Sequence, residues 1–193
     1  PVGEFVETER GWREGVKYLL SWPLTFFDFV TPGLSPWGTE RGVPAILSGG
    51  FSTEAGESFG VAVAHPDAPF SPAAASNGIG EVLKGPSEKG GLHLQHDVKW
   101  ARWAGWDVRN VSSDAMLAAT MLAYRPYTEI KSNLLRLAAD WIGEIEYPWL
   151  HVDKARMAEY PVETVVGVAM TDAEWELRIH GALMAEMDGR GRV

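Results

Sequence analysis

The chain has 193 residues, of which 46% are hydrophobic and 22% are charged, so it is predicted to fold as one globular domain (1–193) rather than to remain disordered. Its formal net charge of −9 argues against a nucleic-acid partner, because nonspecific binding to phosphates depends on basic residues. The absence of cysteine excludes disulfides, thiolate metal sites and cysteine nucleophiles.

The N-terminal part is predicted to contain one helix and one buried strand. Thr8 is a candidate N-cap, and apolar residues at helical spacing follow it as far as Trp22, where Pro23 ends the helix. Residues 24–30 form a compact apolar run that is typical of a buried strand. The stretch 31–44 is rich in proline and glycine and is predicted to be a loop.

Two short strands at 43–51 and 57–66 are expected to form a hairpin, joined by a linker rich in glycine and serine. The segment 66–91 contains four prolines, five glycines and the turn-forming pair Asn77-Gly78. It is therefore predicted to be the longest loop-rich region of the domain, where a lid or a binding loop would lie.

Two consecutive helices are predicted between about 112 and 143. The first begins at Ser112 or Ser113 and ends before a proline corner, and the second runs from 128 to 142 with one apolar face. Gly143 is well placed to end the second helix in a left-handed conformation.

The C-terminal third is predicted to form a β-hairpin. Residues 163–170 are a continuous β-branched run, and residues 174–180 alternate polar with apolar, which makes Glu174 and Glu176 the solvated face of a strand. The alternative is a helix from Thr171, because Thr171 and Glu174 have the spacing of a capping box. The predicted fold class is α+β, with a mostly antiparallel sheet, the two helices of 112–143 on one face, and an N-terminal helix.

One candidate metal site lies in the stretch 93–107. His93 and His96 are three residues apart and would share one face of a helix, with Asp97 as an oxygen ligand. Zinc would be a suitable divalent metal for such a set. If the segment is a strand, the two histidines point to opposite faces and the pair no longer exists.

The same stretch carries a candidate binding surface. Trp100, Trp103 and Trp106 recur every three residues, so a helix would gather their indoles into one ridge, flanked by the cation Arg102. Trp37, in the loop rich in proline and glycine, is a further candidate for partner binding. The alternative interpretation is that these indoles anchor the segment to the core.

No motif for a nucleotide, a serine nucleophile or a zinc peptidase is present, and no family resemblance is found. The main hypothesis is therefore a non-enzymatic interaction or assembly module that binds a protein partner or forms an oligomer through an aromatic surface framed by proline and glycine. It needs no cofactor. One alternative is a small metal-dependent, hydrolase-like enzyme using His93, His96 and Asp97; another is a small-molecule binder with a tryptophan-lined pocket.

The sequence has no secretory signal and no long apolar run, so no membrane association is expected. A cytoplasmic location fits these features, and a virion component would share them.

Overall fold

The computed structural model describes residues 3–33, 35–37, 39, 41, 45–53, 57–123 and 134–190. Six strands form one sheet: β1 (Gly3–Phe5), β2 (Leu24–Val30), β3 (Ser48–Thr53), β4 (Ser58–Ala62), β5 (Glu88–Gly91) and β6 (Val111–Asp114). Their order across the sheet is β1-β4-β3-β2-β5-β6.

The predicted α+β class is confirmed, but the sheet is mixed rather than mostly antiparallel. The predicted hairpin is present, because β3 pairs antiparallel with β4, and β2 also runs antiparallel to β3. The other three neighbouring pairs, β1 with β4, β2 with β5, and β5 with β6, are parallel. The prediction of a mostly antiparallel sheet failed because local sequence patterns specify strands, whereas the direction of a strand depends on the connections between strands.

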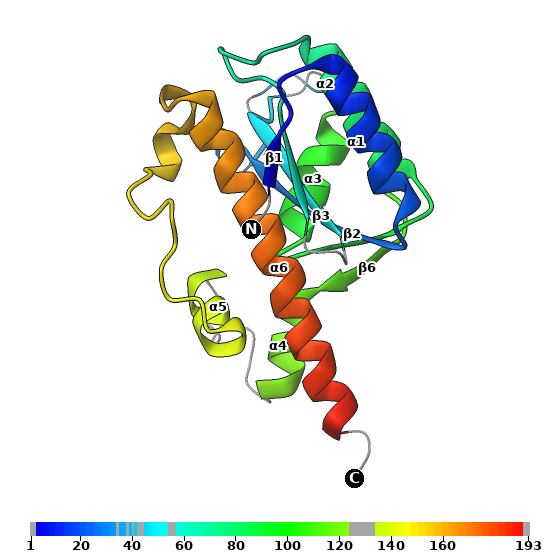
Figure 1. Cartoon of the computed structure of the whole chain (residues 1–193), viewed down its shortest axis with the longest axis vertical. Coiled ribbons are helices and arrows are strands. Elements are labelled where there is room, and N and C mark those ends of the chain that lie inside the picture. Colours follow the sequence, from blue (N-terminus) through cyan, green and yellow to red (C-terminus); the bar gives the residue numbers. More distant parts are fainter. Residues whose placement is uncertain are drawn as a thin grey trace.

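One face of the sheet is covered by α1 (Glu9–Ser21), α2 (Pro72–Lys84) and α3 (Gln95–Trp103) (Figure 1). The predicted N-terminal helix is confirmed as α1, and the Gly11 N–H donates to Thr8 Oγ1 at 3.0 Å. The core of this layer is aromatic, with side chains from α1, β2, β3, α3 and the segment that follows α3: Trp12, Phe27, Phe29, Phe51, Trp100 and Trp106.

Helix α2 lies inside the segment 66–91 that was predicted to be a loop. Ser71 caps it by accepting a hydrogen bond from the Ala74 N–H at 3.3 Å, and Pro72 occupies its first turn. Gly78 belongs to a helix contact rather than to a turn, since a Cβ there would lie 2.2 Å from Trp12 Nε1. The glycine that indicated a turn is required by the close approach of α1.

The opposite face is covered by α6 (Val162–Arg190). The predicted strands at 163–170 and 174–180 are therefore wrong, and the alternative helix from Thr171 has the correct type but starts nine residues too late. Residues 163–170 are β-branched and apolar because this part of α6 packs on the sheet. Gly50 of β3 permits the contact, since a Cβ there would lie 2.1 Å from the main-chain oxygen of Ala169.

The helices α4 (Ala115–Ala123) and α5 (Leu134–Ile142) pack mainly against the C-terminal half of α6 instead of against the sheet. Figure 1 shows α6 extending beyond the sheet to reach them. Gly143 ends α5 with a φ of +71°, as predicted, whereas residues 112–114 belong to β6 rather than to the first turn of α4. The predicted residues 124–133 lie outside the described part of the chain. Within the described part, no helix is long and apolar enough to cross a membrane.

Candidate active site

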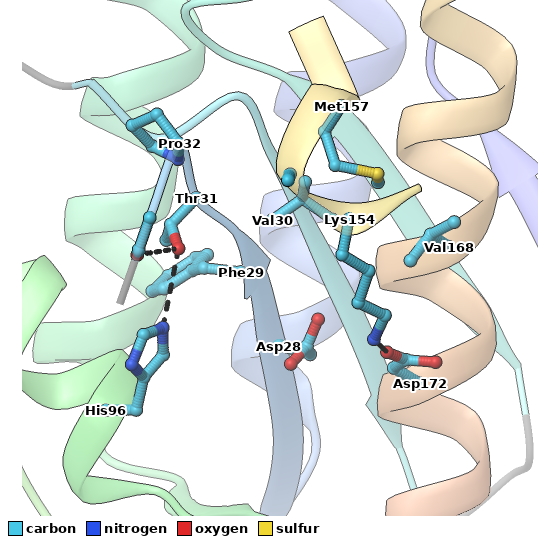
Figure 2. Close-up of a pocket in the computed structure, with 12 residues that line it drawn as sticks. Asp28, Phe29, Val30, Thr31, Pro32, His96, Lys154, Met157, Val168 and Asp172 are labelled. Carbon is cyan, nitrogen blue, oxygen red and sulfur yellow. Dashed lines mark hydrogen bonds and ion pairs between the residues drawn. The ribbon is translucent and has the colours of Figure 1, made fainter. Parts of the chain in front are cut away.

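A pocket of about 490 Å³ opens between β2, the first turn of α3, and α6. Its polar lining residues are Asp28, Thr31, His96, Lys154 and Asp172. Apolar side chains complete the wall, among them Phe29, Val30, Met157 and Val168. Figure 2 shows Asp28 on β2 facing Asp172 on α6, with the Lys154 amine reaching Asp172.

Asp28 reaches the pocket because of the alternation along β2. Phe27 and Phe29 point into the aromatic core beneath α1 to α3. Their neighbours in the strand therefore point toward α6, where Val30 packs against Val165 and Val168. Asp28 is the single charged side chain in this apolar strand, so the strand itself offers no counter-ion.

Asp172 and Glu176 lie one turn apart on α6, on the face that meets the sheet. Glu176 is 3% exposed, and its Oε2 atom has no hydrogen-bond partner in the described part of the chain. Burial raises the pKa of Glu176 well above its usual range, and the charges of Asp28, Asp97 and Asp172 raise it further. The predicted solvated strand face at Glu174 and Glu176 is therefore wrong, because both side chains are buried.

Asp97, on α3, is the fourth carboxylate in this region, after Asp28, Asp172 and Glu176. It is 2% exposed and accepts a hydrogen bond from the Phe29 N–H at 3.1 Å. Burial and the charge of Asp28 raise its pKa well above the usual value. Burial and the charge of Asp172 likewise raise the pKa of Asp28 to about 8. We call Asp28, Asp97, Asp172 and Glu176 the carboxylate cluster, because burial raises the pKa of all four and the charge of another member further raises the pKa of Asp28, Asp97 and Glu176.

Two polar side chains hold Asp172. The Tyr147 hydroxyl donates to Asp172 Oδ1 at 2.5 Å, and Lys154 Nζ lies 3.3 Å from Oδ2. Burial opposes the charged form of Lys154, but the charges of Asp172 and Asp28 outweigh it and raise the pKa of Lys154. Burial still keeps the pKa of Asp172 above its usual value, although Lys154 and Tyr147 lower it. Lys154 is thus a fixed cation at the edge of the cluster.

His96 lies on the other side of the pocket (Figure 2). Its Nε2 atom is 3.4 Å from Thr31 Oγ1. Burial lowers the pKa of His96, and the charges of Lys99 and His93 lower it further, so the imidazole is neutral at pH 7. A neutral imidazole can accept a proton, unlike the protonated ring.

The three predicted metal ligands do not converge on one centre. His93 precedes α3 and has a φ of +57°, so it does not share a helical face with His96. Only His96 of the three lines the pocket, and Asp97 belongs to the carboxylate cluster. Across the described ranges, no three histidine or acidic side chains are arranged to hold a metal ion by themselves.

The tryptophans of the predicted binding ridge are divided between core and surface. Trp100 and Trp106 are 1% and 8% exposed and pack in the core beneath the sheet, so they form no partner surface. Trp103 is half-buried, Arg102 is exposed, and Trp37 has 72% of its surface exposed. The ridge of three indoles is therefore absent, but Trp37 and Trp103 meet at the surface.

Four residues of the site were not predicted from the sequence: Asp28, Lys154, Tyr147 and Asp172. A usable signal was present for Asp28, since a lone carboxylate in an apolar strand is costly to bury unless it has a role. Asp172 was assigned to a turn, although its four-residue spacing to Val168 and Glu176 places all three on one face of a helix. No local signal indicates Lys154 or Tyr147, because both reach α6 from a segment without regular periodicity.

The fold resembles that of exoribonucleases in solved structures. RNase D from Escherichia coli, described as an exoribonuclease involved in structured RNA processing, has a TM-score of 0.70 at 13% identity, covering 100% of this chain and 47% of that protein. Trypanosoma brucei RNase D in complex with RNA U12 has a TM-score of 0.69 at 14% identity, over 94% of this chain and 62% of that one. Brucella melitensis NrnC with bound Mg²⁺ has a TM-score of 0.62 at 15% identity, over 99% of this chain and 82% of that one.

The chain thus spans about half the length of the E. coli enzyme. No protein-family model matches the sequence, and a search of the curated proteins gives no match either. At these identities the likeness defines the fold.

This likeness corrects two predictions made from the sequence. The main hypothesis of a non-enzymatic interaction or assembly module is wrong, because the neighbours in fold are nucleases; the alternative of a hydrolase-like enzyme agrees better. The exclusion of nucleic acid as a partner is also wrong, since a neighbour is solved with RNA. Net charge averages over the whole surface, so it does not exclude a nucleic-acid site where cations gather locally.

Proposed function

We propose that the chain is a nuclease domain that hydrolyses phosphodiester bonds of RNA or DNA in the pocket between β2 and α6. The observation that carries this proposal is the convergence of buried carboxylates from three elements: Asp28 of β2, Asp97 of α3 and Asp172 of α6. The resemblance to an exoribonuclease and to an RNA complex supports the choice of substrate. Burying so many acids destabilises a fold, so their retention favours a catalytic role over a structural one.

An acidic pocket needs cations to accept a phosphate. Carboxylate oxygens are the ligands that Mg²⁺ prefers, and Mg²⁺ is commonly held by one or two carboxylates together with substrate phosphates. Asp28 and Asp172, which line the same pocket, fit that use. Such an ion would neutralise the charge that develops on the phosphate during hydrolysis.

The chain's own residues have distinct roles in this proposal. Asp28 and Asp172 would hold the cation, and Tyr147 is a positioning residue that fixes the Asp172 carboxylate through its 2.5 Å hydrogen bond. Lys154 supplies a permanent positive charge at the mouth of the cluster, where it attracts the phosphate. His96, neutral at pH 7, is the group in the pocket best suited to accept a proton from the attacking water.

The proposal is tested with single-stranded RNA and DNA oligonucleotides labelled at either end. We expect the chain to shorten one or both substrates in Mg²⁺ or Mn²⁺ and not in EDTA, and the labelled end that persists gives the direction. Asp172→Asn should lower the rate by at least about a hundredfold, as removal of electrostatic groups does in other enzymes, whereas Asp140→Asn on the exposed surface of α5 should leave it unchanged. Intact oligonucleotides under every metal condition would overturn the proposal.

A further inference from the structure

An exposed aromatic surface adjoins the pocket and plays no part in the cluster. Trp37 and Trp103 meet edge to face, with ring centroids 4.9 Å apart and an interplanar angle of 80°. The guanidinium of Arg41 lies over the Trp103 ring, 5.7 Å from its centroid. We call Trp37, Trp103 and Arg41 the indole platform. Trp37 has 72% of its surface exposed, so most of its indole is accessible to a ligand.

The indole platform is fixed in place before any ligand binds. The Trp103 Nε1–H donates to Thr39 Oγ1 at 3.1 Å, which ties α3 to the loop that carries Trp37. The Thr39 N–H and hydroxyl both bond to the Pro36 carbonyl, at 2.9 and 2.8 Å. Because these contacts already hold Pro36, Thr39 and Trp103 together, a ligand that stacks on Trp37 loses little conformational entropy at these residues.

The indole platform and the pocket share the same two chain segments. The loop that carries Trp37 begins at the pocket wall, and α3 contributes His96 to that wall and Trp103 to the platform. Seven residues separate His96 from Trp103, which on a helix is two turns, about 10 Å along the axis and within about 20° of the same face. The two sites therefore lie along one face of α3.

Three basic side chains lie on α3 and on the described part of the loop, although the chain as a whole has a charge of −9. Arg41, Lys99 and Arg102 are all exposed along the loop and α3. Aromatic faces interleaved with cations are the combination that binds single-stranded nucleic acid, because bases stack on the rings while cations attract the phosphates.

We infer that the indole platform stacks a base of a single-stranded RNA or DNA whose backbone continues along α3 into the pocket. This inference rests on the proposed function, since it takes the pocket as the site that receives a phosphate. The exposed face of Trp37 takes the base, and Arg41 with Lys99 contacts phosphates. Stacking accepts every base, so the platform contributes affinity without sequence preference.

The test is fluorescence anisotropy with a labelled single-stranded oligonucleotide in EDTA, where cleavage does not interfere. Trp37→Ala should weaken binding by roughly five- to a hundredfold, the range that corresponds to one lost base stack, and Trp37→Phe should restore most of it. Leu150→Ala, at another exposed apolar side chain, is the matched control and should change nothing. An oligonucleotide of equal charge made of abasic sites should bind the wild type weakly and lose nothing further with Trp37→Ala.

The outcomes separate the two proposals. If the chain cleaves nucleic acid but Trp37→Ala binds as the wild type does, the platform is overturned and the nuclease stands. If nothing is cleaved but Trp37→Ala weakens binding to normal and not to abasic strands, the platform stands and the nuclease falls. If Trp37→Ala alters only self-association in sedimentation, the surface is a contact between protein chains and the inference is wrong.

Discussion

Replacing Asp28 with asparagine should stabilise the fold while disabling the site. In the folded chain, burial and the charge of Asp172 raise the pKa of Asp28 from 3.8 to about 8, so this carboxyl keeps its proton at pH 7. In the unfolded chain the carboxyl ionises near its ordinary pKa of 3.8. Unfolding therefore releases a proton between those two values, and the free energy of unfolding falls as pH rises through this window.

The size of the effect follows from the distance between the assay pH and the ordinary pKa. From 3.8 to pH 7 is about three pH units, which corresponds to on the order of 4 kcal/mol of lost stability from this group. Asparagine has no proton to release and avoids the loss. Asp28→Asn should therefore raise the free energy of unfolding at pH 7 by up to about 4 kcal/mol, and the melting temperature by roughly 8 to 16 °C.

Urea unfolding followed by tryptophan fluorescence measures this difference at pH 4, 5.5, 7 and 8. The gap between variant and wild type should be small at pH 4 and should widen up to pH 8, while the exposed control Asp140→Asn stays within about 0.5 kcal/mol of the wild type throughout. A variant no more stable than the wild type at pH 7, or a gain that is equal at every pH, would refute the conclusion that burial and Asp172 raise the pKa of this carboxyl.

Three further changes test the contacts around the site. Lys154→Met removes the ammonium that competes for Asp172, so calorimetry without nucleic acid should find Mn²⁺ bound at least about fivefold more tightly; weaker binding would contradict the competition. Tyr147→Phe removes a hydrogen bond to a carboxylate and should lower the free energy of unfolding in urea by about 1.5 to 3 kcal/mol, whereas unchanged stability would mean that this bond contributes nothing. Gly50→Ala forces a Cβ to within 2.1 Å of a main-chain oxygen of α6 and should cost at least about 3 kcal/mol, while Gly181→Ala, with open space around it on the same helix, should gain about 0.5 to 1; two equal effects would exclude the close packing of α6 on β3.

Elements with a complete local signal were predictable from the sequence. The cap at Thr8, the apolar stripe after it, and the stop at Pro23 define α1 without reference to the rest of the fold. The run at 24–30 and the hairpin of β3 and β4 are similarly local. Gly143 ends α5 where its lack of a side chain permits a positive φ.

The C-terminal helix was predicted only as the alternative to a hairpin, and from Thr171 instead of Val162, because its packing on the sheet overrides the strand propensity of its first half. The composition of residues 163–170 suits a strand. The same residues are apolar because this part of the helix packs against the sheet. Glu174 and Glu176 then appeared to alternate with apolar neighbours as in a solvated strand. In the helix Glu176 shares a face with Asp172, and both are buried against β2.

The candidate site was only partly predictable for a related reason. The stretch 93–107 did contain functional candidates, but Asp97 and His96 act with residues about 70 positions away in sequence rather than with each other. The convergence of β2, α3 and α6 depends on the order of the strands, which short-range patterns do not encode. The unpaired charge of Asp28 within an apolar strand was the clearest local indication of a site.

The most direct test of the central claim is crystallographic. Crystals of the wild type with Mn²⁺ and a short oligonucleotide carrying non-cleavable phosphorothioate linkages would locate the cation by its anomalous scattering. We expect a peak within bonding distance of Asp28 and Asp172 that also contacts a phosphate, with the strand leaving along α3. A peak elsewhere, or a strand that avoids the pocket between β2 and α6, would contradict the account.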